Sequence, residues 1–215
     1  GAAKLARGLN AGRTGLSEKQ AEEAGFDPIS VVCVTDDKAH YYPGADCFAT
    51  KLIADRTTGK LLGMQVVGAG AVDKMTDIAA VGISAGLSLS DFDTMDLAYA
   101  PPFSTAIHPF VQACYILENK ISGAFETFTP AEYASGAAEG YRVIDVQPAP
   151  SVPGAEWIDL GKVTGEIEGT AKDEKLLLVC TRGKRGYFLQ NRLKHFGYSN
   201  TKVLEGGAFF NKIKA

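Results

Sequence analysis

The stretch that most constrains this chain runs from Leu176 to Gly186, with the sequence LLLVCTRGKRG. Its first four apolar residues are typical of a short, fully buried strand, and Cys180 follows that strand directly. The loop after Cys180 holds glycines and cations, and apolar residues then recur at helical spacing over 187–196. The sequence therefore predicts a strand, a loop that begins with a cysteine, and a helix in succession.

A loop of this kind can bind an anion beside the cysteine sulfur. The backbone amides of a tight loop and of a helix N-terminus converge on one point, where they stabilise negative charge. Such surroundings favour the thiolate, which is the nucleophilic form of a cysteine. The alternative is a buried structural cysteine, because unpaired cysteines are often buried, but cations are not expected around a core thiol. The expected anion-binding residues are Thr181, Arg182, Gly183, Lys184 and Gly186, with Cys180 as the nucleophile and Arg185 fixing the loop.

Charge is distributed unevenly along the chain. Residues 170–215 contain ten Lys or Arg and three Asp or Glu, a net charge of +7, whereas residues 1–169 carry −10. Such a difference suggests two units with different partners. The basic segment contains Cys180, which fits a small anionic substrate. Nucleic acid is not expected as a partner, because no basic stripe with interleaved aromatic residues is present.

Several classes of protein are disfavoured by simple patterns. No apolar run approaches the roughly 18 residues that a membrane-spanning helix requires, so no membrane partner is expected. The cysteines at 33, 47, 114 and 180 lack metal-ligand spacing, so no metal site is expected. The chain shows no secretory signal pattern, and its cysteine usage fits a reducing, cytoplasmic location.

The first half of the chain reads as an antiparallel meander with helices. Residues 2–14 are small, basic and glycine-rich, and are expected to be a helix remnant and linker. Ser17 and Gln20 have capping-box spacing, which predicts a helix start, and residues 55–60 predict a hairpin connection. The other expected elements are strands over 29–35, 48–54 and 61–67 and helices over 17–24, 71–87, 90–95 and 108–119.

A G-x-G sequence at Gly68–Gly70 follows a predicted strand and precedes a helix, which is the position of a dinucleotide-binding fingerprint. Asp73 stands where the third glycine would be, and its charge would repel a pyrophosphate. The preceding strands pair through a hairpin, whereas the fingerprint belongs to a parallel βαβ unit. We therefore interpret the glycines as a tight connection between strand and helix.

The second half carries a resemblance to rhodanese-like domains, in YRVIDV at 141–146, PGA at 153–155, CTRGKR at 180–185 and VLEGG at 203–207. The resemblance implies an α/β domain over 125–215, with a parallel sheet flanked by helices, that carries sulfur as a persulfide on Cys180. Cysteine phosphatases have a similar loop with five residues between Cys and Arg; four separate Cys180 from Arg185, which suits a persulfide better. Gln147 replaces a frequent Arg, and the segment 145–153 is short, so an open pocket is expected.

Residues 13–123 carry a second resemblance, in RTGLSEKQAEEAGF, HYYPGA and DLAYAPPFSTAIHP. These motifs resemble the dimerisation domain of FAD-dependent pyridine nucleotide-disulfide oxidoreductases, on the branch of NADH oxidases and coenzyme A-disulfide or persulfide reductases. The resemblance implies an α+β domain over 1–124, a homodimer, and residues 1–14 left from an upstream FAD domain. FAD and NAD(P)H would serve the full-length enzyme, and this chain would bind neither tightly.

The second resemblance also assigns individual residues. Tyr41 and Tyr99 match two tyrosines that reach the flavin-side cysteine of the partner subunit, although Tyr42 competes with Tyr41 for that match. A phenol there can donate a hydrogen bond to a leaving thiolate; packing at the dimer interface is the alternative. His108 stands where related enzymes use a catalytic histidine, and is expected to be structural or exposed.

The sequence therefore predicts the C-terminal part of a flavin-dependent disulfide or persulfide reductase. Its substrate would be a small sulfur-containing anion or a thiol persulfide, including one derived from coenzyme A. Two alternatives remain open at this point: a non-catalytic dimerisation or docking module with an inactive rhodanese-like domain, and a cysteine phosphatase.

Overall fold

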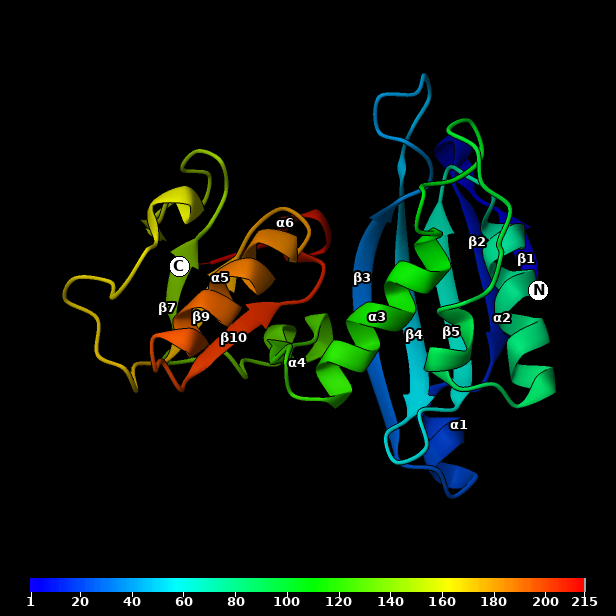
Figure 1. Cartoon of the computed structure of the whole chain (residues 1–215), viewed down its shortest axis with the longest axis horizontal. Helices are drawn as coiled ribbons and strands as arrows, with labels where there is room; N and C mark the ends of the chain where they lie inside the picture. Colours follow the sequence, from blue (N-terminus) through cyan, green and yellow to red (C-terminus); the bar gives the residue numbers. More distant parts are fainter. Residues whose placement is uncertain (215) are drawn as a thin grey trace. The chain divides into compact units, whose positions relative to one another are not determined.

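The computed structural model describes residues 1–214, which form two compact units (Figure 1). The first unit is Gly1–Ile121, and the second begins at Ser122. Each unit has its own five-stranded sheet. The sheet of the first unit is antiparallel and that of the second is parallel, which confirms the two fold classes predicted from the sequence.

The first unit is a sheet with helices packed on it. Its elements are β1 (Ala2–Lys4), η1 (Ala6–Gly8), β2 (Asn10–Gly15), α1 (Glu18–Glu23), β3 (Pro28–Asp36), β4 (Cys47–Asp55), β5 (Leu61–Gly68), α2 (Val72–Ala85), η2 (Leu89–Phe92) and α3 (Pro109–Ile121). The strand order is β1-β2-β5-β4-β3. α2 packs on β2 and β5, while α3 packs on β3 and β4. Phe92 of η2 meets Phe110 of α3 edge to face, with ring centroids 4.8 Å apart.

The N-terminal residues correct one prediction, because residues 2–14 are not a helix remnant and linker. They form β1 and β2, and β2 pairs with β5 from Asn10↔Gly68 to Gly15↔Gly63. The glycines that suggested a linker are there because neighbours approach closely. A Cβ on Gly12 would lie 2.1 Å from Oγ1 of Thr76, and Gly15 has a φ of +70° with Leu62 O 2.2 Å from a Cβ position.

The capping box predicted from Ser17 and Gln20 is confirmed. The Ser17 hydroxyl accepts a hydrogen bond from the Gln20 amide at 3.3 Å, and the Gln20 side chain accepts one from the Ser17 amide at 3.0 Å. This reciprocal pair satisfies two free amides at the start of α1. The helix predicted over 90–95 is a single 3₁₀ turn, η2, and its capping box uses Ser88 and Asp91. A turn this short follows from the capping contacts rather than from helix propensity.

The second unit has the strand order β6-β10-β9-β7-β8, and all of these strands are parallel. Its elements are β6 (Thr127–Phe128), α4 (Pro130–Ala134), β7 (Arg142–Asp145), β8 (Glu156–Trp157), η3 (Leu160–Lys162), β9 (Leu176–Val179), α5 (Lys184–His195), β10 (Thr201–Leu204) and α6 (Gly207–Phe210). β9 is the central strand and all four of its residues are buried. This confirms the strand predicted from the four apolar residues.

The helix after β9 begins earlier than the apolar spacing predicted. α5 starts at Lys184 rather than at residue 187, and Gly183 precedes it with a φ of +95°. Gly186 therefore lies in the first turn of α5, where a Cβ would be 2.9 Å from Cγ1 of Val203. The charged residues of this turn conceal its helical character, because they contribute nothing to the apolar pattern.

Candidate functional site

The carboxyl ends of three adjacent parallel strands carry the polar residues of the second unit. Asp145 is the last residue of β7, Cys180 follows β9, and Glu205 follows β10. Because the three strands are parallel neighbours, these residues lie along one edge of the sheet (Figure 1). This is the edge at which parallel α/β sheets place their ligands.

Cys180 stands at the centre of this edge, and its side chain is buried, with 3% of its surface exposed. The Gly183 amide donates a hydrogen bond to the Cys180 sulfur at 3.1 Å. The chain can turn back in this way because Gly183 adopts the left-handed conformation that glycine tolerates. The loop thus closes over its own cysteine, with a backbone amide directed at the sulfur.

The segment after β7 forms one wall of this loop. The buried carboxylate of Asp145 accepts hydrogen bonds from the amides of Gln147, Ser151 and Val152, at 3.0, 2.6 and 2.9 Å. These bonds fold the short, proline-rich segment into a compact turn. The short segment 145–153 therefore has a defined structure, held by one buried carboxylate.

Two contacts tie that wall to the cysteine loop. The Thr181 hydroxyl donates to Oε1 of Gln147 at 2.7 Å, and Nε of Arg185 donates to the Val146 carbonyl at 2.6 Å. Gln147 is itself 9% exposed, and its carbonyl accepts a hydrogen bond from the indole of Trp157 at 2.9 Å. Arg185 and Thr181 therefore attach the cysteine loop to the segment after β7, and Gln147 is one of the contacts of the loop.

A second wall comes from α6, on the other side of β9. The amide of Ala208 donates to the Cys180 carbonyl at 2.9 Å, and the amide of Phe209 donates to the Thr181 carbonyl at 2.8 Å. Gly207 lies against the same carbonyl, since a Cβ there would be 2.0 Å from it. This wall was not predicted from the sequence. The EGG segment that ends at Gly207 is the sequence feature that indicates it.

The cations of the loop stand at an unusual place for positive charge. Lys184 and Arg185 occupy the first turn of α5, which contains no acidic residue. A helix N-terminus carries partial positive charge and normally attracts acidic side chains. Lys184 is exposed and Arg182 is half-buried, so both stand close to solvent beside Cys180. An anionic ligand would relieve the repulsion that this arrangement creates.

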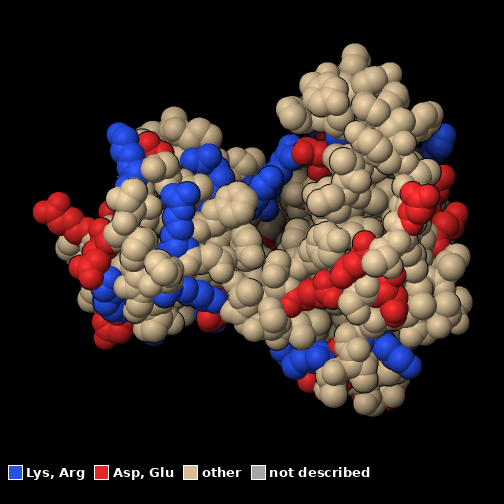
Figure 2. Space-filling model, viewed as in Figure 1, with Lys and Arg blue, Asp and Glu red and all other residues tan. Residues whose placement is uncertain are grey.

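The surface view shows Lys and Arg side chains on the face of the second unit that faces the viewer (Figure 2). Some of these cations have a carboxylate partner: Glu126 lies 3.1 Å from Lys194 and 3.0 Å from Lys202. Burial alone would raise the pKa of Glu126, but the hydrogen bonds from these two lysines lower it below its ordinary value. These two lysines therefore have a structural role.

The tyrosines predicted from the dimerisation-domain resemblance lie in the first unit. Tyr41 is 71% exposed in the loop between β3 and β4, and Tyr99 is 53% exposed in the extended segment before α3. In Figure 1 both segments reach beyond the same end of the sheet. Lys74 at the start of α2 donates to the Ala98 carbonyl at 3.4 Å, which attaches the Tyr99 segment to that end. Both phenols are accessible from solvent.

His108 is buried, as the structural interpretation of this residue expected. Its Nδ1 accepts a hydrogen bond from the Phe110 amide at 3.2 Å, at the N-terminus of α3. Burial, with a smaller contribution from the charge of Lys74, lowers the pKa of His108 from 6.5 to about 4. The imidazole is therefore neutral at pH 7 and serves as an acceptor that caps α3.

This histidine should make the first unit less stable in mild acid. Between pH 6.5 and about 4 the unfolded chain protonates His108 while the folded chain does not, so stability is lost as the pH falls through this window. We expect the free energy of unfolding to fall by an amount on the order of 2 kcal/mol, after allowance for solvent screening. Urea unfolding at pH 7 and pH 4.5, followed by circular dichroism, measures it. His108→Asn keeps a hydrogen-bond acceptor at the cap and should remove most of the pH dependence of stability. His195→Asn replaces an exposed histidine and should leave that pH dependence in place. Equal pH dependence in all three proteins would contradict this role.

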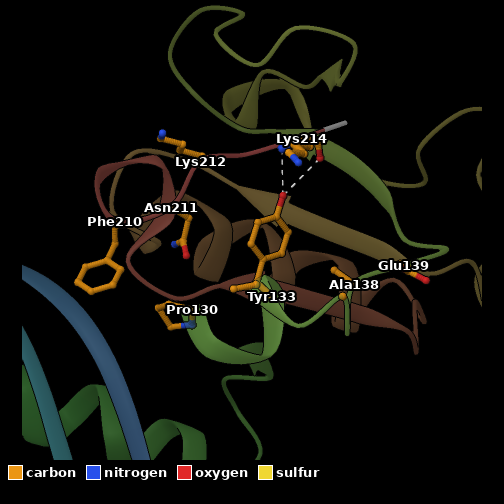
Figure 3. A pocket seen from close by; sticks show the side chains of 10 residues that line it. Pro130, Tyr133, Ala138, Glu139, Phe210, Asn211, Lys212 and Lys214 are labelled. Carbon is orange, nitrogen blue, oxygen red and sulfur yellow. Dashed lines mark hydrogen bonds between the residues drawn. The ribbon is translucent and has the colours of Figure 1, made fainter.

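A pocket of the second unit lies away from Cys180, and residues of α4 and α6 are among those that line it (Figure 3). It has a volume of about 650 Å³. The Tyr133 hydroxyl accepts a hydrogen bond from the Lys214 amide at 3.0 Å and donates one to the Lys214 carbonyl at 3.4 Å. The ring of Phe210 and the amide of Asn211 border the pocket on the α6 side. These contacts close the C-terminal segment over the unit.

The G-x-G sequence does not fit a dinucleotide. β5 pairs antiparallel with both of its neighbours, so no βαβ unit surrounds Gly68 and Gly70. A Cβ on Gly68 would lie 2.6 Å from the Cys47 carbonyl, and one on Gly70 would lie 2.8 Å from a carboxylate oxygen of Asp37. Close packing therefore explains these glycines, and they are not assigned to the binding of FAD or NAD(P)H.

Residues 1–214 contain no helix with the length and hydrophobicity needed to cross a bilayer. The same residues contain no group of three or more His, Cys, Asp or Glu side chains placed to hold a metal ion.

Comparison with known proteins gives consistent relatives for this chain. Residues 7–110 match the family of the pyridine nucleotide-disulphide oxidoreductase dimerisation domain. An NAD(P)H sulfur oxidoreductase (CoA-dependent) of Pyrococcus furiosus is 38% identical over 110 residues, which are 51% of this chain and 25% of that protein. The chain therefore spans about a quarter of the length of this relative.

Two solved structures match both units. An NAD-dependent persulfide reductase from A. fulgidus is 31% identical with a TM-score of 0.86, and the match covers 96% of this chain and 38% of that one. The reduced Bacillus anthracis CoADR-RHD is 30% identical with a TM-score of 0.86, covering 97% and 38% of the respective chains. Residues 7–110 therefore match the dimerisation domain of the pyridine nucleotide-disulphide oxidoreductases, and both units together have the fold of the persulfide reductase and of CoADR-RHD.

Proposed function

We propose that the second unit carries sulfane sulfur as a persulfide on Cys180, within a longer flavin-dependent disulfide or persulfide reductase. The observation that carries the proposal is the closed loop in which the Gly183 amide meets the Cys180 sulfur at 3.1 Å, beside cations at the N-terminus of α5. Those groups stabilise a thiolate and the anionic end of a donor. The matching relatives are named as sulfur and persulfide reductases, which agrees with this chemistry.

The first step is attack of the Cys180 thiolate on the outer sulfur of a donor such as a thiol persulfide or polysulfide. A new S–S bond forms to the Cys180 sulfur, the S–S bond of the donor breaks, and its electron pair leaves with the donor thiolate. Loop amides, the exposed Lys184 and the half-buried Arg182 hold the anionic species, while Arg185 keeps the loop in place through Val146. An acceptor thiolate then takes the outer sulfur and regenerates the Cys180 thiolate. Neither step changes the total number of electrons.

Release of the carried sulfur as sulfide consumes two further electrons. We assign the supply of these electrons to the FAD- and NAD(P)H-dependent part of the longer enzyme. Tyr41 and Tyr99, both exposed at one end of the first unit, are proposed to donate hydrogen bonds to a thiolate or persulfide at that active site. A substrate derived from coenzyme A is part of the proposal, because relatives are named for coenzyme A.

The experiment that tests sulfur carriage uses the intact chain. The protein is incubated with polysulfide, desalted, and treated with cyanide, which removes sulfane sulfur as thiocyanate. We expect about one equivalent of thiocyanate per chain. No thiocyanate would contradict the proposal and favour the alternative, a dimerisation or docking module whose rhodanese-like unit is inactive. Hydrolysis of a chromogenic phosphate ester would instead favour a cysteine phosphatase.

We further propose that the first unit forms a homodimer through its exposed apolar side chains. Phe103 and Ile107 are 73% and 53% exposed and follow Tyr99 in the same segment. A patch of this kind is typical of an interface. Phe103→Asp should weaken the dimer by about 10-fold or more, because it places a charge in an apolar contact. Sedimentation of this variant, beside Phe26→Asp at the other end of the sheet, measures the effect. Equal dimerisation of both variants would contradict the assignment of this surface.

A further inference from the structure

Two consecutive peptide groups of the cysteine loop are oriented by α6. The carbonyls of Cys180 and Thr181 accept hydrogen bonds from the amides of Ala208 and Phe209, at 2.9 and 2.8 Å. The described residues contain no cis peptide bond. In a planar trans peptide the N–H group points opposite to the preceding carbonyl. The amides of Thr181 and Arg182 are therefore directed away from α6.

The next amide of the loop continues this series. The Gly183 amide donates to the Cys180 sulfur at 3.1 Å. Successive amides directed to one side of the chain form a concave nest that binds an anion. The orientation of the first two of these three amides, those of Thr181 and Arg182, therefore depends on whether α6 holds the two carbonyls on the opposite side.

α6 is well placed to hold them. Ala208 and Phe209 lie in its first turn, where amides have no partner within the helix. The side chain of Asn211 donates to the carbonyls of Glu205 and Gly207, at 2.9 Å each, and so fixes α6 to the end of β10. Gly207 has a φ of +49°, and only a hydrogen fits between it and the Cys180 carbonyl. α6 thus has its own anchor and approaches the loop as closely as sterics allow.

We propose that α6 is the positioning element of the cysteine loop. The amides of Ala208 and Phe209 turn the loop amides inward, and the resulting nest binds the terminal sulfur of a persulfide or the anionic end of its donor. Neither residue touches the substrate; both act through Cys180 and Thr181. This inference rests on the proposed function and names the residues on which its anion binding depends.

The test removes one amide and leaves its neighbours in place. Ala208→Pro deletes the N–H group that holds the Cys180 carbonyl, whereas Ala208→Gly keeps it. Two rates are measured on the intact chain: uptake of sulfur from polysulfide, and alkylation of Cys180 by iodoacetamide with increasing sulfate, which reports anion binding without turnover. We expect Ala208→Pro to take up sulfur about 10-fold more slowly and to need about 10-fold more sulfate for protection. Each change corresponds to the loss of one charge-assisted hydrogen bond between a loop amide and the anion. Ala208→Gly should behave as wild type.

Unfolding followed by the fluorescence of Trp157, the single tryptophan of the chain, shows whether each variant is folded. If Ala208→Pro does not fold, Asn211→Ala tests the role of α6 instead. This variant removes the bonds that fix α6 to β10 and leaves the residues of the loop unchanged. A several-fold loss of sulfate protection is expected. Wild-type protection and uptake in a folded Ala208→Pro protein, or in Asn211→Ala, would overturn the positioning role. Absence of uptake in the wild type would contradict the proposed function, and sulfate protection would still decide the role of α6.

Discussion

Replacing Cys180 with serine is expected to abolish the uptake of sulfane sulfur and to leave the second unit folded. Serine has nearly the same shape as cysteine, and its hydroxyl can still accept the hydrogen bond that the Gly183 amide donates to the sulfur. An alcohol is a far weaker nucleophile than a thiolate and cannot form a persulfide. After incubation with polysulfide, the intact mass of the wild type should rise by one sulfur atom, and cyanide should reverse the gain. The variant should show no gain.

A matched control separates this effect from the general reactivity of thiols. Cys33, Cys47 and Cys114 are also buried and form no disulfide with a described residue, and Cys47, at 8% exposure, is the most exposed of the three. Burial also raises the pKa of the Cys114 thiol far above its ordinary value, with a smaller contribution from Glu118, so Cys114 is protonated and unreactive. Cys47→Ser should therefore take up sulfur as the wild type does. A full gain of sulfur in Cys180→Ser would show that another cysteine carries it.

Replacing Gly207 with alanine is expected to destabilise the second unit strongly. A Cβ at this position would lie 2.0 Å from the Cys180 carbonyl and 2.7 Å from the Thr181 carbonyl, and both neighbours are backbone atoms. The φ of +49° adds a conformational cost for alanine of about 1 kcal/mol. Relief requires α6 to move away and to lose its bonds to the loop. We expect a loss of about 4 kcal/mol in the free energy of unfolding.

Gly197→Ala is the control for this substitution, because it isolates the conformational cost. Gly197 has a φ of +86°, and no atom lies within 4 Å of its Cβ position. Its substitution should cost about 1 kcal/mol. Urea unfolding followed by Trp157 fluorescence compares the two variants within the same unit. Equal losses would show that the loop tolerates a displaced α6, and would contradict the close packing of Gly207 against Cys180.

The elements that the sequence predicted well have local causes. Four consecutive apolar residues indicate the buried strand β9, and Ser17 with Gln20 indicates the start of α1, because both patterns act within one element. The rhodanese-like loop was found for the same reason, since Cys180 and Arg185 lie within six residues of each other. The contacts of Arg185 with Val146 and of Thr181 with Gln147 were not predicted, because they join residues more than 30 positions apart.

The errors have the opposite cause. Residues 2–14 resemble a linker because glycine and small residues carry little strand propensity, yet β2 is held by pairing with β5, which is distant in the sequence, from Asn10↔Gly68 to Gly15↔Gly63. The apolar spacing predicts a start for α5 that is too late, because Lys184 and Arg185 add nothing to an apolar pattern although both lie in its first turn. For β2, pairing with a strand that is distant in the sequence decided the structure.

By itself, the sequence determined that a cysteine follows a buried strand, that a loop with glycines and cations comes next, and that an antiparallel meander precedes them. Spacing, capping and hydrophobic runs carry this information because they act between near neighbours in the chain. The tertiary structure decided which way the loop amides point. That orientation depends on carbonyls of Cys180 and Thr181 meeting the amides of Ala208 and Phe209, and these groups meet because the parallel strands β9 and β10 end side by side.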